Sequence, residues 1–340
     1  MTLGACGGWL ASKIGMPLPW LLGATIANAV WVLSLPGKLN PVWAPPLFRN
    51  VFVAVIGVMI GGLFTVDLIA TLPGWWPGII ALIIYCFVAQ IGGYLIYRRI
   101  GGLDRATAFF SASPGGFVEN IMLGERAGAD VPILSMLQFL RIVLVVSIIP
   151  FGFLLWTGHA VGSAAGADFG GGGAGTAVDY LILAVAGAFG LALGLSLKIP
   201  AGQVIGPITA SAIVHLTGLV EIQPPAVAGI VAQIVVGSSL GARFAGASPK
   251  LLLRTSRLAI LGVAWMLALA IIFAAVVHMI TDRDPTLYVM SFAPAGVIEM
   301  SLIALTLGAN PVFVTAHHII RLFVTVVVTP MLYWRWLAKK

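Results

Sequence analysis

Apolar residues dominate this chain in long runs, and polar residues interrupt them at nearly regular intervals. The first half predicts helices from Met1 to about Gly15, Pro17 to about Leu33, Pro46 to Leu68, and from the Trp75-Trp76 turn to Tyr97. In the second half, Leu258 to Ile280 carries no Lys, Arg, Asp or Glu and exceeds the roughly 20 residues of a spanning helix. The runs are apolar on every side, whereas barrel strands alternate with period two. The pattern therefore predicts an all-α polytopic membrane protein.

A block of forty residues occurs twice. Ser111 to Pro150 returns without a gap, 180 residues later, as Ser291 to Pro330. The first copy covers most of a hairpin-like segment, Asp104 to Asp130, broken at residues 113–116, and a helix from Val131 to about Thr157. We expect Ser113 and Pro114 to be the N-cap and first residue of the second half-helix. The identical positions are Ser111/Ser291, Pro114/Pro294, Gly116/Gly296, Glu119/Glu299, Gly128/Gly308, Ala129/Ala309, Arg141/Arg321, Val146/Val326 and Pro150/Pro330.

The duplication extends over most of the chain. A Gly/Ala-rich segment follows the first copy, and its composition predicts a flexible linker. We therefore predict a first membrane repeat over residues 1–157, the linker over 158–177 and a second membrane repeat over 178–340. The first copy begins about a turn and a half later than the second, which leaves open a start upstream. At an offset of 183 residues, Gly4, Gly7, Pro17 and Gly23 correspond to Gly187, Gly190, Pro200 and Gly206.

Composition and the positions of charge set the expected topology. Hydrophobic residues make up 60% of the chain and charged residues 9%, against about 25% charged in an average soluble domain. If each hairpin-like segment enters and returns on one side, each repeat crosses the membrane five times, and the second is inverted relative to the first. A broken helix that crosses fully is the alternative. The first arrangement places these basic residues inside, as the positive-inside rule requires: Lys38, Arg49, Arg98, Arg99, Arg105, Arg126, Lys198, Arg243, Lys250, Arg254, Arg257, Arg335, Lys339 and Lys340.

We therefore expect two inverted repeats, each with five transmembrane helices and one broken re-entrant hairpin, or about ten transmembrane helices in all. The protein should lie in a bacterial inner membrane with both termini in the cytoplasm and the linker outside. This is the plan of many secondary transporters.

Several functional classes are disfavoured. The net charge of +7 comes from basic residues dispersed singly in short loops, so we expect no nucleic-acid partner. Cys6 and Cys86 fall inside apolar helices and suit small buried residues. No cluster of His, Cys, Asp and Glu has metal-ligand spacing in the sequence, and no nucleophile and base stand at a recognisable spacing. We expect neither a metal nor another cofactor, and no enzyme.

Polar groups of the duplicated block should meet at the centre of the bilayer. Ten residues separate Asp104 from Pro114, or about 15 Å at a helical rise of about 1.5 Å. That is half of a hydrocarbon core about 30 Å thick. Ten residues also separate Val131 from Arg141 and, from the other face, Pro311 from Arg321. Both breaks and both arginines are thus predicted at one depth.

Arginines at that depth, beside the amides of a half-helix, favour an anion site. A central arginine costs about 2.5 to 3.5 kcal/mol on insertion scales and is usually paired or faces a cavity. Glu119 and Glu299 are the expected partners, either as structural ion pairs or as carriers of a coupling proton or Na⁺. The expected substrate-binding residues are Ser111, Ser113, Gly115, Gly116, Gln138, Arg141, Ser291, Gly296, His318 and Arg321, and the expected ion-coupling residues are Glu119 and Glu299.

The tandem blocks SxSPGG…E…GAD…Q…R…P and SxxPAG…E…GAN…R…P, with GxxxGxRF before the second, resemble the duplicated AbrB membrane family. The resemblance covers almost the entire chain. Members of that family are labelled as ammonia monooxygenases or as regulators of gene expression, and the family is similar in plan to inverted-repeat transporters. The resemblance implies membership of the family and no particular substrate.

Three functions follow as expectations. The leading one is a secondary transporter of a small anionic organic solute, coupled to H⁺ or Na⁺ and moving like an elevator by analogy of fold. A membrane-embedded regulator or scaffold without transport is the alternative, and a membrane monooxygenase the third. The expected partners are the solute, the lipid bilayer and a second copy of the chain in a homodimer.

Overall fold

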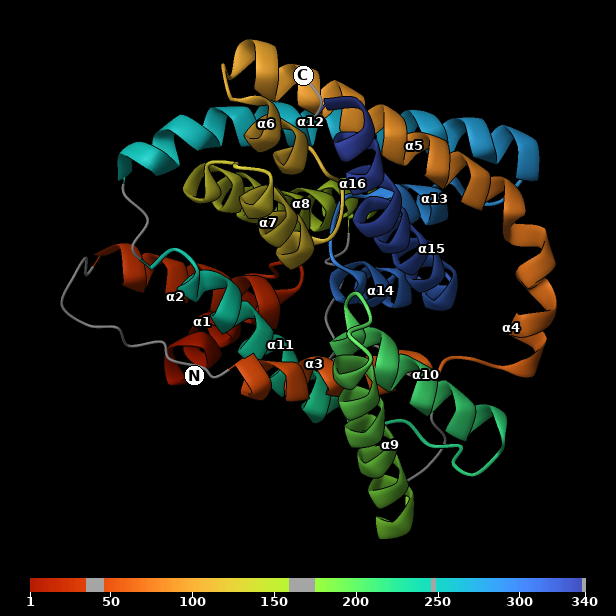
Figure 1. The fold of residues 1–340 in the computed structure, drawn as a ribbon. Coiled ribbons are helices and arrows are strands. Elements are labelled where there is room, and N and C mark those ends of the chain that lie inside the picture. Colours follow the sequence, from red (N-terminus) through yellow and green to blue (C-terminus); the bar gives the residue numbers. More distant parts are fainter. Residues whose placement is uncertain (35–45, 159–174, 246–248, 338–340) are drawn as a thin grey trace. The chain divides into compact units, whose positions relative to one another are not determined.

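The computed structural model describes residues 1–34, 46–158, 175–245 and 249–337, and every regular element in those ranges is helical (Figure 1). The predicted all-α class is confirmed. Most of the predicted linker, residues 159–174, lies outside the described residues. The helices of the first half are α1 (Thr2–Lys13), α2 (Pro19–Ser34), α3 (Pro46–Gly61), α4 (Val66–Thr71), η1 (Leu72–Trp75), α5 (Trp76–Leu95), η2 (Ile96–Ile100), α6 (Arg105–Ser111), α7 (Phe117–Arg126) and α8 (Val131–Thr157).

The second half follows the same broad order, with the single helix α12 where the first half has α4, η1, α5 and η2. Its helices are α9 (Ala177–Ser196), α10 (Gly202–Leu216), α11 (Ala226–Ala242), α12 (Pro249–Thr281), α13 (Pro285–Phe292), α14 (Val297–Thr306), α15 (Pro311–Phe323), η3 (Val324–Val328), α16 (Thr329–Leu332) and η4 (Tyr333–Leu337). The predicted helix from Pro46 to Leu68 differs, because it divides into α3 and α4 around Gly61 and Gly62. Glycine lacks the side chain that would favour a continuous helix there.

Many of these helices suit a membrane. Within the described residues, five stretches are long and apolar enough to cross a bilayer: Leu72–Ile100, Val131–Trp156, Ala177–Ser196, Lys250–Thr281 and Pro311–Arg335. Four shorter helices, α2, α3, α10 and α11, are also apolar. Such lengths and compositions are those of a helical membrane protein.

The chain forms two compact units, and each contains segments of both predicted repeats. The first unit comprises Met1–Leu72, Ile149–Gly246 and Ser301–Val312. The second comprises Pro73–Ile148, Ala247–Met300 and Phe313–Lys340.

Glycines hold the first unit together. Gly7 of α1 and Gly23 of α2 pack so closely that a Cβ on either would collide with the backbone of the other. Gly190 of α9 and Gly206 of α10, the matching residues of the second copy, do the same (Figure 1). Small residues allow such close approach where burial of apolar surface cannot drive helices together.

The third helix of each copy packs on the second helix of the other copy. Gly61 of α3 lies against the carbonyl of Ile208 in α10, and Gly241 of α11 lies against the carbonyl of Thr25 in α2. A polar contact accompanies each pair. The Ser211 hydroxyl donates to the Val58 carbonyl at 2.7 Å, and the matching Asn28 amide donates to the Ser238 hydroxyl at 3.2 Å. In the first unit, therefore, each copy supplies the second helix on which the third helix of the other copy packs.

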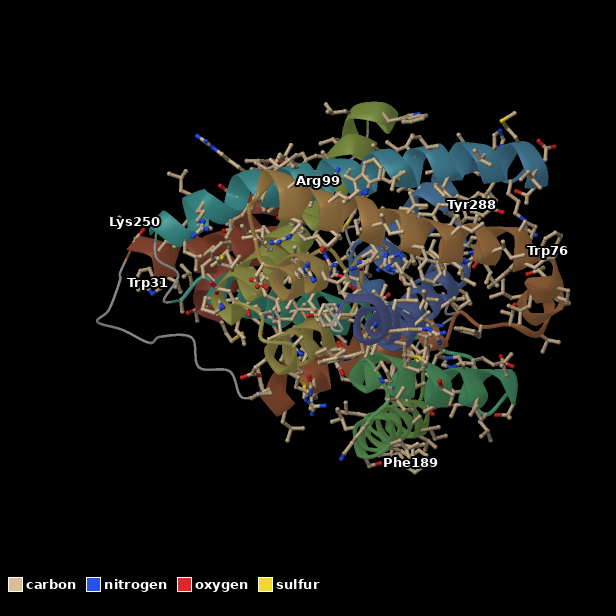
Figure 2. All side chains as sticks on the ribbon, turned by 45° about the horizontal axis from the view of Figure 1, so that its top comes forward. Trp31, Trp76, Arg99, Phe189, Lys250 and Tyr288 are labelled. Atoms are coloured by element: carbon tan, nitrogen blue, oxygen red, sulfur yellow. The ribbon has the colours of Figure 1, made fainter. Side chains whose placement is uncertain are left out.

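Two long antiparallel helices form the frame of the second unit. Along α5 and η2, Tyr85 meets Met266 of α12, and Tyr97 meets Gly262. Trp76 and Arg99 lie toward opposite ends of the first of these helices (Figure 2). Because the helices are antiparallel, Arg98 and Arg99 share one end with the basic start of α12, at Lys250, Arg254 and Arg257.

Substitution of the paired glycines tests the close packing of α1 on α2 and of α9 on α10. Replacing Gly23 or Gly206 by leucine forces two backbones apart, and overpacking typically costs about 1 to 3 kcal/mol. We expect a lower apparent melting temperature for both variants in detergent. The control is Gly152→Leu, because no heavy atom outside its own helix backbone lies within 4 Å of a Cβ at that position. An equal fall in melting temperature for all three variants would contradict the close packing of the paired glycines.

Candidate functional site

Two helical hairpins repeat one another at the same spacing along the chain. The breaks at residues 112–116, here the first tip, and 293–296, the second tip, separate α6 from α7 and α13 from α14. An offset of 180 residues relates the starts of α6 and α13, α7 and α14, and α8 and α15. The break predicted within the first hairpin is confirmed.

The capping predicted at the first tip is wrong. The N-cap of α7 is Gly116, whose left-handed φ of +68° is unfavourable for residues with a Cβ. Ser113 lies earlier in the tip, and its hydroxyl donates to the Gly115 carbonyl at 3.0 Å. The left-handed turn at Gly116 thus displaces the start of the half-helix by three residues.

Hydrogen bonds from the Asn120 side chain hold the first tip in its conformation. Its side-chain amide donates to the carbonyls of Gly115 and Gly116, the latter at 2.6 Å, and to the Ser113 hydroxyl at 3.0 Å. The asparagine is fully buried. The sequence reasoning missed it, because the matching residue of the second copy is Met300 and the position shows no repeat.

Helices α8 and α15 hold the ends of α6 and α13 in the same way. The Gln138 amide donates to the Phe110 carbonyl at 2.6 Å, and the His318 Nε2 contacts the matching Met290 carbonyl at 2.9 Å. One turn later, Arg141 donates to the Ser113 carbonyl. The pairs are 28 residues apart in both copies, so the duplicated sequence builds duplicated geometry.

Arg321 bridges the two tips. Its guanidinium donates to the carbonyls of Ala293 and Ala295 in the second tip, and contacts the His318 Nδ1 at 3.3 Å. It also lies beside the first tip, where a Cβ on Gly115 would be 3.7 Å from the Arg321 Nε and 2.8 Å from the Thr325 hydroxyl. The tips therefore meet at one side chain.

The two hairpins approach this point from opposite ends of α5. In the first, the Phe109 carbonyl accepts from Gln90, and the tip residue Ala112 lies against Gly93, toward the Arg99 end. In the second, Tyr288 lies against Gly78, near Trp76, and the later Phe292 stacks on Tyr85 with ring centroids 5.9 Å apart (Figure 2). The hairpins thus enter from the two ends, and the first reaches Gly93 while the second reaches Tyr85.

The glutamates occupy different positions from those expected. The hydrogen bonds of both arginines go to main-chain carbonyls and His318, in place of Glu119 and Glu299. Each glutamate is the third residue of its helix and folds back toward the helix start, near Gly116 or Gly296. Carboxylates there complement the helix dipole and the free amides.

Buried polar atoms converge around the arginines. Arg141 and Arg321 are each 3% exposed, and both Nε atoms lack a hydrogen-bond partner among the described residues. The Ser111 hydroxyl and the Gln138 carbonyl oxygen are also buried and unpartnered there. The charges of both arginines reach Tyr85 of α5, and each acts on the other. The geometry thus gathers two cations and several free polar groups.

The other residues predicted to bind substrate lie in or next to the two tips. Gly115 and Gly116 form the first tip and Gly296 ends the second. Ser291 lies in the last turn of α13, and its hydroxyl donates to the Leu287 carbonyl of its own helix at 2.8 Å. No group of three metal-ligating side chains occurs within the described residues. An arrangement of fixed cations without such a cluster suits the binding of an anion.

Comparison with known proteins gives a family and two relatives. The family model described as transition state regulatory protein AbrB matches residues 20–338. The "Uncharacterized protein YhjN" of Bacillus subtilis (strain 168) is 25% identical over 98% of this chain and 91% of its own length. The "Putative regulator AbrB" of Escherichia coli (strain K12) is 25% identical over 93% of this chain and 88% of its own length.

The role of Asn120 can be tested by a pair of matched substitutions. Asn120→Leu keeps the size but leaves buried carbonyls of the first tip unsatisfied, at a cost of about 1 to 3 kcal/mol each. We expect a lower apparent melting temperature and faster amide exchange at residues 112–116. Met300→Leu changes the equivalent buried position of the second copy without removing a hydrogen bond, and should cost less than about 1.5 kcal/mol. Similar amide exchange at residues 112–116 in both variants would rule out this role of Asn120.

Proposed function

This chain belongs to the AbrB family, and we propose that it is a secondary transporter that carries a small anionic organic solute across the bacterial inner membrane. The observation that carries the proposal is the convergence of two broken hairpins on two buried arginines. Irregular backbone at membrane depth is tolerated only where protein buries it or where it lines a cavity. Transporters use such discontinuous helices to bind their substrates.

The depth of the arginines supports this function. Arg141 lies near the middle of the span Val131–Trp156, and Arg321 near the middle of Pro311–Arg335. A buried cation at that depth costs several kcal/mol unless something compensates for its charge. Main-chain carbonyls satisfy hydrogen bonds and leave the net charge in place. An anionic solute would neutralise it, and the free Nε–H groups of both arginines could donate to that solute.

The approach of the hairpins from opposite ends of α5 supports inverted repeats. We propose five crossings and one re-entrant hairpin in each repeat, about ten crossings in all, with both termini in the cytoplasm. The shared basic end of α5 and α12 then faces the cytoplasm, as the positive-inside rule requires.

The division into units supports an elevator-like mechanism. The first unit holds the first three helices of both repeats, and the second holds the first hairpin, the second hairpin up to Met300 and both arginines. We propose that the second unit carries the solute and the first serves as the scaffold. Glu119 and Glu299, at the starts of α7 and α14, are the candidate carriers of a coupling ion.

Ligand-induced stabilisation tests the binding site. We would screen purified protein against small carboxylates, sulfonates, phosphonates, amino acids and ammonium, with and without Na⁺. A ligand at 100 times its Kd stabilises the folded state by about 2.7 kcal/mol. We expect one anionic class to raise the melting temperature of the native protein, and Arg141→Ala to abolish both this shift and uptake into proteoliposomes.

The control for this test is Arg254→Ala, which removes an exposed arginine at the basic end of α12. It should retain the shift and the uptake. Normal uptake by Arg141→Ala would refute the anion site. A folded protein that responds to no compound would instead favour the regulatory role that the name of the Escherichia coli relative carries.

Labelling of single cysteines tests the topology. In a variant with Cys6 and Cys86 replaced by alanine, Trp76→Cys and Arg99→Cys place thiols at opposite ends of the exposed face of α5 and η2. We expect an impermeant maleimide to label intact cells at position 76 only, and position 99 only after the cells are opened. The reverse pattern would overturn the proposed orientation.

A further inference from the structure

The two copies of the site differ where Gln138 of α8 corresponds to His318 of α15. Both side chains bind a carbonyl in the last turn of the matching half-helix, Phe110 or Met290. Only the histidine also contacts its arginine, at 3.3 Å between the His318 Nδ1 and the Arg321 Nη2. The chain thus places a titratable ring where the other copy has an amide.

The partners of His318 determine its tautomer. A carbonyl can only accept, so the Nε2 carries the hydrogen bonded to Met290. A guanidinium can only donate, so the Nδ1 must accept from Arg321. Both bonds are satisfied only by the neutral ring with its hydrogen on Nε2. Protonation of Nδ1 would break the bond to Arg321 and place two cations side by side.

We propose that His318 is a positioning residue for Arg321 and the proton-binding group that couples solute binding to H⁺. The neutral ring holds the guanidinium against the second tip, where Arg321 also donates to Ala293 and Ala295. This inference rests on the proposed function, because the anion that favours protonation is the transported solute.

The surroundings of His318 set the sign of the coupling. The charged or titratable groups that act on the ring are Arg321 and His317 of its own helix, while α13 offers only the Met290 carbonyl. From α5, Tyr85 and Cys86 act on Arg321, and from α8 Arg141 does so. None of these groups is a carboxylate, and the carboxylate of Glu299 in α14 lies toward Gly296 at the end of the second tip. A further positive charge on His318 is therefore unfavourable in the unliganded site.

A bound anion would offset the repulsion between a protonated His318 and Arg321. Anion binding therefore promotes proton binding, and by linkage proton binding increases the affinity for the anion. The affinity should rise as the pH falls through the range in which the anion-bound site takes up its proton. Proton and anion would then cross the membrane together.

The neighbouring His317 supplies a matched control. It is equally buried, but its Nδ1 contacts the Phe313 carbonyl of its own helix at 2.8 Å and does not contact Arg321. His318→Gln introduces the residue of the first copy, which can donate to Met290 and accept from Arg321 without titrating. Comparison of His318→Gln with His317→Gln separates the effect of the bond to Arg321 from the effect of a buried imidazole that lacks this bond.

The ligand-free arm of the test is the apparent melting temperature between about pH 8 and about pH 5.5, on either side of the ordinary histidine range. The native protein and His317→Gln should lose stability in acid by more than His318→Gln does. The same acid sensitivity in the native protein and His318→Gln would overturn the proposal. Loss of the acid sensitivity in His317→Gln, with the sensitivity retained in His318→Gln, would also overturn the proposal.

The ligand arm uses acetate, succinate and citrate as probes. For whichever binds, the native protein and His317→Gln should bind at least about fivefold more tightly at the lower pH, a coupling typical of linked sites. In His318→Gln, the affinity should no longer change between the two pH values. Retention of the full dependence by His318→Gln would refute the coupling.

The two proposals fail in different ways. If none of the three probes stabilises the native protein and none is taken up by proteoliposomes, carriage of a small carboxylate fails, and the ligand-free arm still decides whether His318 holds Arg321. If a probe binds through Arg141 with no dependence on pH, the transport site stands and the role of His318 is refuted.

Discussion

The guanidinium of Arg321 and the carbonyls of the second tip each need the other. A helix that stops near the middle of a membrane leaves carbonyl groups without partners, and an arginine at that depth leaves its donors without partners. Bonds from Arg321 to Ala293 and Ala295 satisfy these carbonyls and part of the guanidinium, whose Nε has no partner among the described residues. The remaining charge has no counterpart among these bonds, and this imbalance supports a site for an anion.

Duplication reproduces this solution, because the same sequence spacing places the same donors against the same carbonyls. Gln138 and His318 lie 28 residues beyond the carbonyls that they bind, and so do Arg141 and Arg321. In the first unit, the paired glycines of α1 with α2 and of α9 with α10 repeat in the same manner. Contacts within one copy follow the local sequence, whereas contacts between copies join each third helix to a second helix of the other.

Local features of the fold could be predicted from the sequence, whereas the partners of its polar groups could not. Pro114, Gly115 and Gly116 interrupt an apolar run, so the break was predictable from backbone chemistry. The start of α7 was not, because the left-handed φ at Gly116 moves the N-cap three residues beyond Ser113. The pairing of arginine with glutamate was expected from charge alone. Glu119 instead lies in the first turn of α7, so its position along the helix directs it toward the helix start.

Positions that the copies share and positions where they differ have separate roles. The shared arginines donate to carbonyls of the tips that each hairpin buries. The copies differ at two positions, Asn120 against Met300 and Gln138 against His318. Asn120 adds hydrogen bonds to the first tip, and His318 places a titratable ring beside Arg321. In the proposed transporter, divergence at these two positions would give the two tips different roles, while the duplicated arginines place a cation at each tip.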